Sequence, residues 1–372
     1  MASSARFLIL TASMGEGHNT AARNIRNALL AEGVGEKNIL LDDPYNATNP
    51  LFNRIIESGY RVAINRYPGA WKLLFNFLSK PGVVEGIGPM LSELRRALKS
   101  LIGQFRPDVI VSTYPIFSFL LRRLSRGQGC LPPLFTVITD STQINAAWYR
   151  WLCAGFIVAD ETTQQTLVAD KVPPAIIHVL GFPVCPKFES SQPAPHPGQG
   201  LWRAIFFPSG SIRRAVETIQ CLDSLSGFSL TVIAGRRAGL VKALQSRGMP
   251  KRGELLGWTD RMPELMASHH FFIGKAGGAT VQEALAARIP FIVSHVVPGQ
   301  EEGNIALIER LGVGTLAAGS PSHVADLLRG ATANDGTIWR AWRANLEKNW
   351  HPGASRRIAQ FLLSQARPGA LA

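Results

Sequence analysis

The chain has 372 residues, 46% of them hydrophobic, and carries a formal net charge of +13. This length and composition support two domains with full cores and exclude a disordered protein. The positive charge predicts an anionic partner, although a generally basic, arginine-rich surface is the simpler alternative. No nucleic-acid-binding signature such as a paired Cys/His finger accompanies the charge, so we expect no nucleic acid partner.

The four cysteines lie far apart and form no CxxC pair: Cys130, Cys153, Cys185 and Cys221. They predict reduced thiols in a cytoplasmic protein rather than a disulfide scaffold or a zinc site. No stretch approaches ~20 uninterrupted apolar residues, and the N-terminal apolar run, FLIL, is too short for a signal peptide. Any contact with a membrane is therefore expected to be peripheral.

Strand and helix patterns alternate along residues 1–188. The first strand is predicted in RFLILTAS and the first helix in NTAARNIRNALLAEG, which ends at Gly33. Further strands are predicted in NILLDD, DVIVSTYP, LFTVITD and GFIVAD. This alternation is typical of a doubly wound α/β domain.

A second alternation begins after residues 189–200, whose Pro, Gly and Ser content predicts a linker. Strands are predicted in RAIFFPSG, SLTVIAG, GELLGW, HHFFIG and PFIVSHV, which gives a second domain over 201–345. Residues 346–372 predict a closing helix with Ile358, Phe361 and Leu362 on its apolar face. The fold class is therefore α/β, with two Rossmann-like domains.

The most informative stretch is residues 271–304. An apolar strand runs into a glycine turn, Gly274–Gly278, and a helix follows with Thr280 near its start and Glu283 one turn in. Bare backbone and free helix N–H groups at such a turn can hold a diphosphate, and Glu283 could then take the hydroxyls of a ribose. A polar cluster occupies the loop after the next strand: Gln300, Glu301 and Asn304. An ordinary βαβ turn would explain the glycines but not the polar loop.

Two motifs in this stretch, GGATVQEAL at 277–285 and PGQEEGN at 298–304, carry a family resemblance. They resemble the GT-B glycosyltransferases that build lipid-linked sugars, in particular the monogalactosyldiacylglycerol synthase and processive diacylglycerol glucosyltransferase group. The resemblance implies a GT-B fold, in which two Rossmann-like domains face a central cleft. It also implies that the first domain binds the lipid acceptor, that the second binds the nucleotide-sugar, and that the last helix crosses back to the first domain.

The turn after the first strand, TASMGEGH at 11–18, allows two interpretations. Gly15-x-Gly17 with Asp42 and Asp43 also fits a dinucleotide fingerprint, which predicts a dehydrogenase. The third small residue would then be Thr20, which weakens that alternative. The GxGH form, continued as HNTAARNI, instead resembles the N-terminal signature of the same glycosyltransferase group.

His18 stands at a helix N-terminus, where the helix dipole lowers its pKa and leaves a neutral imidazole. Such a group suits a general base that removes the proton of an acceptor hydroxyl, although a capping or phosphate-touching histidine is the alternative. The resemblance adds Asp140 as a second catalytic residue that orients the acceptor or His18, with an Asx turn as the alternative. It places Trp148 beside the acceptor.

The segment GWTDRM at 257–262 resembles the one whose backbone contacts the base in related enzymes. The full set of expected donor-binding residues is Gly17, Ser209, Gly210, Trp258, Met262, Gly277, Gly278, Ala279, Thr280, Glu283, Gln300, Glu301 and Asn304. The chain departs from the group at Ala276, where proline is usual, and at Phe207–Ser211, where relatives carry a glycine-rich loop. Ser209, Ser211 and Arg213 could supply side-chain contacts there instead.

Residues 54–81 form a basic segment with an aromatic and aliphatic face, typical of helices that lie on an anionic bilayer. We expect membrane or acceptor contacts from Tyr67, Trp71, Lys72 and Phe75, with packing of a helix on the domain core as the alternative. The expected location is the inner face of the cell membrane.

These features predict transfer of a hexose from a UDP-sugar to a lipid acceptor, diacylglycerol being the first candidate, and the resemblance implies inversion. The chain contains no DxD, and its histidines lack metal-ligand spacing, so no metal or other cofactor is expected; the UDP-sugar is a substrate. The alternatives are an N-acetylglucosaminyltransferase with another lipid acceptor, a UDP-sugar epimerase, and a catalytically silent lipid- or nucleotide-binding protein.

Overall fold

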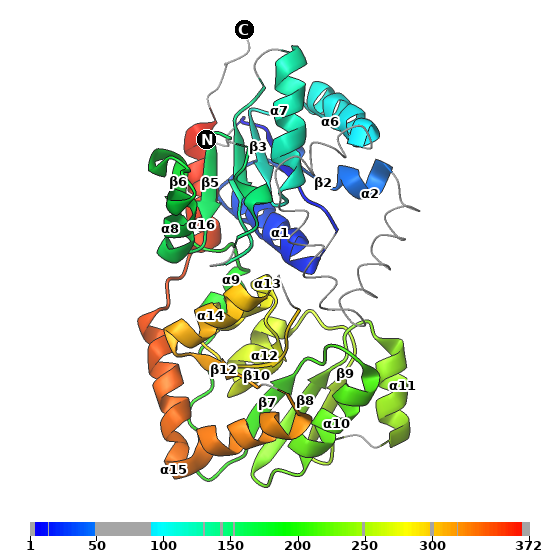
Figure 1. The fold of residues 1–372 in the computed structure, drawn as a ribbon, viewed down its shortest axis with the longest axis vertical. Coiled ribbons are helices and arrows are strands. Elements are labelled where there is room, and N and C mark those ends of the chain that lie inside the picture. Colours follow the sequence, from blue (N-terminus) through cyan, green and yellow to red (C-terminus); the bar gives the residue numbers. More distant parts are fainter. Residues whose placement is uncertain are drawn as a thin grey trace. The chain divides into compact units, whose positions relative to one another are not determined.

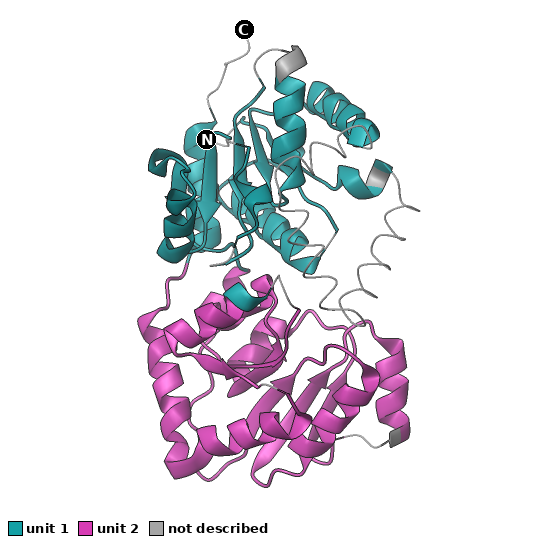
Figure 2. Cartoon of the chain, in the orientation of Figure 1, with its two compact units in different colours: residues 1–184, 298–303, 353–372 teal, residues 185–297, 304–352 magenta. Residues whose placement is uncertain are grey.

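The computed structural model describes residues 4–13, 15–48, 91–128, 131–141, 144–151, 153–247, 250–297, 301–317 and 319–366. The chain divides into two compact units (Figure 2). Unit 1 comprises Met1–Val184, Pro298–Gly303 and Gly353–Ala372, and unit 2 comprises Cys185–Val297 and Asn304–Pro352. Residues 189–200, predicted as a linker, lie within unit 2, because Ala194 is buried and the Pro195 carbonyl accepts a hydrogen bond from His270 Nε2 at 3.0 Å.

Unit 1 is built on a parallel sheet of six strands in the order β2-β1-β3-β4-β5-β6. The strands are β1 (Phe7–Leu10), β2 (Ile39–Asp42), β3 (Val109–Ser112), β4 (Leu134–Val137), β5 (Gly155–Val158) and β6 (Ile177–Val179). Four of them, β1, β3, β4 and β5, are buried throughout, as expected for parallel strands covered by helices. The chain winds in opposite directions from β1, to β2 on one side and β3 on the other, so the switch point lies at β1 and β3.

The helices of unit 1 cover this sheet (Figure 1). They are α1 (Glu16–Ala31), α2 (Pro44–Thr48), α6 (Ser92–Phe105), α7 (Ile116–Gln128), α8 (Glu161–Ala169) and α16 (Ala354–Gln365), with 3-10 turns η1 (Glu36–Asn38), η3 (Ala146–Trp148) and η4 (Pro174–Ile176). The closing helix α16 packs on α1 with Ile358 and Leu362 fully buried. Phe361, on the same predicted face, is partly buried and meets the Phe135 ring at 5.2 Å.

Unit 2 contains a second six-stranded parallel sheet, in the order β12-β11-β10-β7-β8-β9. Its strands are β7 (Trp202–Phe206), β8 (Phe228–Ile233), β9 (Gly253–Leu256), β10 (Phe271–Lys275), β11 (Phe291–His295) and β12 (Gly314–Leu316). The order reverses between β7 and β10. Ligands of such sheets bind outside the carboxyl ends of the strands at this reversal, so the turns after β7 and β10 flank the expected binding crevice.

Helices pack on both faces of the second sheet (Figure 1). They are α9 (Pro186–Ser190), α10 (Ile212–Asp223), α11 (Ala238–Arg247), α12 (Met262–Ser268), α13 (Gly278–Ala286), α14 (Glu302–Leu311) and α15 (Pro321–Lys348). α10 and α15 share one core cluster, whereas α12, α13 and α14 share another. α15 is kinked at Asn334–Gly336, whose three residues have left-handed φ values of 50°, 56° and 69°. No described helix is long and apolar enough to cross a bilayer.

Candidate functional site

In unit 1, the imidazole of His18 lies where three strand ends converge. His18 belongs to the first turn of α1, which follows β1. Its Nδ1 lies 2.9 Å from Oγ1 of Thr139, which follows β4. Its ring meets those of Tyr114, after β3, at 5.1 Å and Trp148 at 5.8 Å. The predicted base is therefore at the switch point of its sheet.

The His18 imidazole is neutral near pH 7. Burial lowers its pKa to about 4, against an opposing hydrogen bond with the Thr113 backbone. The direction matches the expectation from sequence, but the dominant cause is burial and not the helix dipole. When Nδ1 donates to Thr139, Nε2 keeps its lone pair and can accept a proton.

Asp140 acts on His18 only indirectly. Its Oδ2 accepts a 2.7 Å hydrogen bond from Nε1 of Trp148, and that indole is the ring beside His18. Burial raises the pKa of Asp140 to about 6, against the opposing effect of the Trp148 bond. Trp148 itself is 2% exposed and belongs to the core of unit 1. The pair therefore fixes one of the aromatic rings that pack beside His18.

The turn after β1 disfavours the dinucleotide alternative. Both carboxylate oxygens of Asp43 are engaged: Oδ2 accepts from the Ser13 amide and hydroxyl at 2.8 and 2.6 Å, and Oδ1 accepts from the Asn46 amide at 3.0 Å. Asn19 adds bonds to Thr11 and Ser13. The acidic residue of a dinucleotide fingerprint must face a ribose. The Asp43 carboxylate instead accepts hydrogen bonds from neighbouring loop residues.

In unit 2, the turn after β10 presents free backbone. Gly277 caps α13 with no side-chain hydrogen bond, so the first amides of the helix are unsatisfied by the described residues. A Cβ at Gly277 would come within 3.2 Å of Nζ of Lys275, which places that ammonium over the turn. Asn304 donates from Nδ2 to the Ala276 carbonyl at 2.8 Å. Lys275 was not among the residues predicted from sequence, although it lies between Gly274 and Gly277.

The turn after β7 stands across the switch point. Ser211 caps α10, its Oγ accepting from the Arg214 amide at 3.2 Å. Gly210 has φ 75°, and a Cβ there would meet the His295 ring at 3.3 Å. Arg237, after β8, donates to the carbonyls of Pro208 at 3.1 Å and Gly210 at 2.8 Å. An arginine therefore holds the backbone of this loop.

The remaining expected donor residues lie at different depths. Trp258 is 63% exposed at the end of β9, with the Arg236 guanidinium 5.5 Å from its ring. The Met262 side chain packs on the core, which leaves its backbone for a ligand. Glu283 is half-buried on α13, and Glu301 is buried. Gly17 belongs to α1 of unit 1.

Six of the donor-binding residues predicted from sequence therefore lie at the strand ends beside the switch point of unit 2. The six are Ser209, Gly210, Gly277, Gly278, Ala279 and Thr280. Gln300 and the predicted membrane residues Tyr67, Trp71, Lys72 and Phe75 lie outside the described residues.

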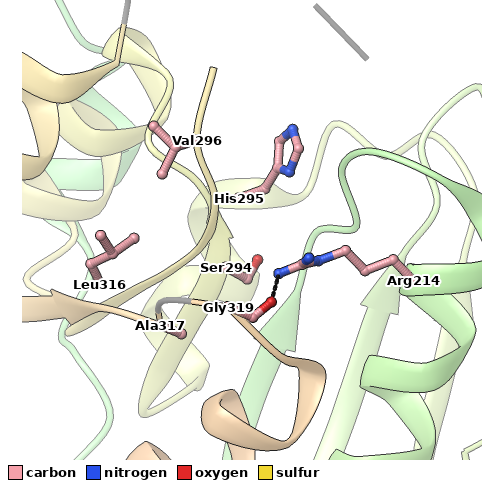
Figure 3. A pocket seen from close by; sticks show the side chains of 7 residues that line it. All are labelled: Arg214, Ser294, His295, Val296, Leu316, Ala317 and Gly319. Carbon is pink, nitrogen blue, oxygen red and sulfur yellow. Dashed lines mark hydrogen bonds between the residues drawn. The ribbon is translucent and has the colours of Figure 1, made fainter. Parts of the chain in front are cut away.

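A pocket of about 250 Å³ lies beside the start of α10 and the ends of β11 and β12 (Figure 3). It is lined by Arg214, Ser294, His295, Val296, Leu316, Ala317 and Gly319. Arg214 reaches across it and donates to the Gly319 carbonyl at 2.9 Å (Figure 3). Sequence reasoning missed this pocket because β12, only three residues long, was not predicted.

Within the described part of the chain, no group of three or more His, Cys, Asp or Glu side chains could hold a metal ion. The expectation of metal-independent chemistry stays a prediction.

Comparison with known proteins bears on both units. Residues 18–184 match the family model described as monogalactosyldiacylglycerol (MGDG) synthase. The chain is 26% identical to the processive diacylglycerol beta-glucosyltransferase of Staphylococcus epidermidis (strain ATCC 12228 / FDA PCI 1200), over 90% of this chain and 86% of the relative. The same-named protein of Bacillus subtilis (strain 168) is 23% identical over 97% and 95%. The resemblance to this glycosyltransferase group is confirmed.

Solved glycosyltransferase structures match the fold over nearly the whole chain. The glycotransferase of kitacinnamycin superposes with a TM-score of 0.62 at 15% identity, covering 97% of this chain and 99% of that one. The calicheamicin glycosyltransferase CalG4 gives 0.62 at 12% identity, covering 99% and 100%. The fold is GT-B, with one Rossmann-like domain in each unit.

Proposed function

We propose that the protein transfers a hexose from a UDP-sugar to diacylglycerol with inversion at the anomeric carbon. The observation that carries the proposal is the neutral imidazole of His18 at the switch point of unit 1. His18 lies inside the segment that matches the MGDG synthase family model. The relatives named processive diacylglycerol beta-glucosyltransferase, matched over most of their length, support the same acceptor and a β-linked product.

In the proposed reaction, Nε2 of His18 accepts the proton of the acceptor hydroxyl as its oxygen attacks the anomeric carbon. The bond from that carbon to the diphosphate oxygen breaks, and the nucleoside diphosphate leaves. A base of this kind contributes about 10²–10⁴-fold to the rate. Thr139 holds Nδ1, which fixes the ring for this transfer.

The leaving diphosphate would be stabilised by unit 2. The first amides of α13 are uncapped by side chains, and Lys275 stands over the same turn. Amides and cations already aimed at developing negative charge stabilise it without reorganisation. Glu283, one turn into α13, would accept the ribose hydroxyls, and the segment from Trp258 to Met262 would contact the base.

We further propose peripheral attachment to the anionic inner face of the cell membrane through residues 54–81. The support is compositional, since this segment combines basic side chains with Tyr67, Trp71 and Phe75. Vesicle co-sedimentation of a Trp71→Ser, Phe75→Ser double variant, with a thermal melt alongside, tests it. Loss of vesicle binding with an unchanged melting temperature supports membrane contact. A large fall in melting temperature would instead indicate that both side chains pack in the core.

The activity test uses diacylglycerol liposomes with UDP-glucose, UDP-galactose or UDP-N-acetylglucosamine, and His18→Ala as the control. We expect one glycosyldiacylglycerol, absent with His18→Ala, whose anomeric proton coupling by NMR identifies a β linkage. Interconversion of UDP-sugars without lipid product would identify an epimerase. UDP binding with no turnover of any donor would identify a silent binding protein.

A further inference from the structure

Arg237 donates two hydrogen bonds, from two different nitrogens, to one loop. Its guanidinium donates to the carbonyls of Pro208 and Gly210, at 3.1 and 2.8 Å, from the loop that follows β8. No carboxylate pairs with Arg237 among the described residues. Burial lowers the pKa of this guanidinium. A half-buried cation therefore donates to main-chain carbonyls beside the switch point of the sheet.

The two captured carbonyls fix the direction of two amides. In a trans peptide, the C=O of one residue and the N–H of the next point in opposite directions. The described peptides contain no cis bond. The Ser209 and Ser211 N–H groups therefore point away from Arg237, and neither forms a hydrogen bond with the described residues.

Gly210 lets both amides sit in one small turn. Its left-handed φ of 75° is a conformation that side-chain-bearing residues rarely adopt. Successive amides around such a residue form a concave anion site, and here the turn leads directly into α10. The turn is thus built with one glycine and an arginine that holds its carbonyls.

We propose that Arg237 is a positioning residue that holds the Pro208–Ser211 turn with its amides aimed at the diphosphate of the donor. The inference rests on the proposed function, because it assumes that unit 2 binds a nucleoside diphosphate. Both terminal nitrogens of the guanidinium donate to carbonyls of this turn, and the proposed effect on the ligand is exerted through the loop that they hold.

The experiment compares UDP, by calorimetry, with uridine, by NMR titration, because uridine lacks both phosphates. Arg237→Gln should weaken UDP binding about 10- to 100-fold, the loss expected for charge-assisted hydrogen bonds, and leave uridine binding unchanged. Arg237→Lys keeps the charge but not the planar fork, so it should bind UDP nearly as weakly as Arg237→Gln. Arg329→Gln removes an exposed cation paired with Asp326 on α15, and it should match the wild type.

Three results would overturn the role of Arg237. They are wild-type UDP affinity in Arg237→Gln, equal losses for UDP and uridine, and recovery of UDP affinity in Arg237→Lys, which would indicate a charge effect. If Arg237→Gln melts early, Arg237→Lys is judged by the same comparison of UDP with uridine. Absence of UDP binding by the wild-type protein would instead contradict the proposed function itself.

Discussion

Asn304, in the PGQEEGN motif, is hydrogen-bonded to Ala276, in the glycine turn just before the GGATVQEAL motif. Nδ2 of Asn304 donates to the Ala276 carbonyl at 2.8 Å, and both residues are buried. Oδ1 of Asn304 has no hydrogen-bond partner among the described residues. The PGQEEGN loop thus contributes a side chain that fixes the backbone of the glycine turn.

Asn304→Ala should therefore destabilise the protein and weaken UDP binding together. Removing Nδ2 leaves a buried carbonyl unsatisfied, which costs about 1–3 kcal/mol. Urea unfolding measures the first effect and UDP calorimetry the second. Asn345→Ala is the matched control, because Asn345 donates in the same way to the Gly312 carbonyl at 2.9 Å, away from the turn. It should lose stability but keep UDP affinity; a parallel loss of affinity would assign both effects to general loosening.

Glu283→Ala should weaken UDP binding about 10- to 100-fold, because a hydrogen bond to a charged group contributes about 1.5–3 kcal/mol. Turnover at saturating donor should change much less. The binding loss should disappear for a ligand without ribose, such as inorganic diphosphate. Unchanged UDP affinity in a folded variant would remove Glu283 from the site.

The pH dependence of kcat/KM should show no loss of a base at pH 6.5. Because burial lowers the pKa of His18 to about 4, the imidazole stays unprotonated down to that pH. Below pH 6.5 the unfolded chain takes up a proton that folded His18 refuses, so this group makes the fold less stable as pH falls towards 4. Circular dichroism at each pH therefore accompanies the assay. A midpoint near 6.5 that persists in Asp140→Asn would show that His18 titrates normally.

Asp140→Asn should stabilise the protein at pH 8 and not at pH 4. Burial raises the pKa of Asp140 from 3.8 to about 6, so the folded state resists its ionisation and stability falls as pH rises through that interval. Two pKa units correspond to about 3 kcal/mol at most, and the partial exposure of the carboxylate reduces that figure. Asparagine can still accept the bond from Trp148. Equal stabilisation at both pH values would contradict the shift.

Much of the fold was predictable because parallel strands are marked by uninterrupted apolar runs. FLIL, VIVS and FFIGK each became a buried strand, and the polar residues after them fell at the strand ends where sites form. His18 and the glycine turn at 277–278 were predictable for the same reason.

The rest depended on contacts between residues distant in sequence. The clamp of Arg237 on Gly210 joins loops 27 positions apart, and nothing in the RRAG segment indicates it. β12 is too short to show a period, and the left-handed turn at Asn334–Gly336 lies inside what reads as one helix. The Pro-rich segment at 189–200 suggested a linker, but hydrogen bonding to Pro195 holds it on unit 2.

The position of α16 has a consequence for how the protein is made. Ile358, Ala359 and Leu362 complete the core that Ile25 and Leu29 of α1 begin, so unit 1 is assembled from both ends of the chain. All of unit 2 is synthesised between these two parts. Since domains generally fold as they emerge from the ribosome, an apolar face of α1 stays uncovered until Ala354–Gln365 has been synthesised and released. A chain that stops before Gly353 keeps the base and the donor turns, but it lacks the helix that completes the core of unit 1 on which α1 packs.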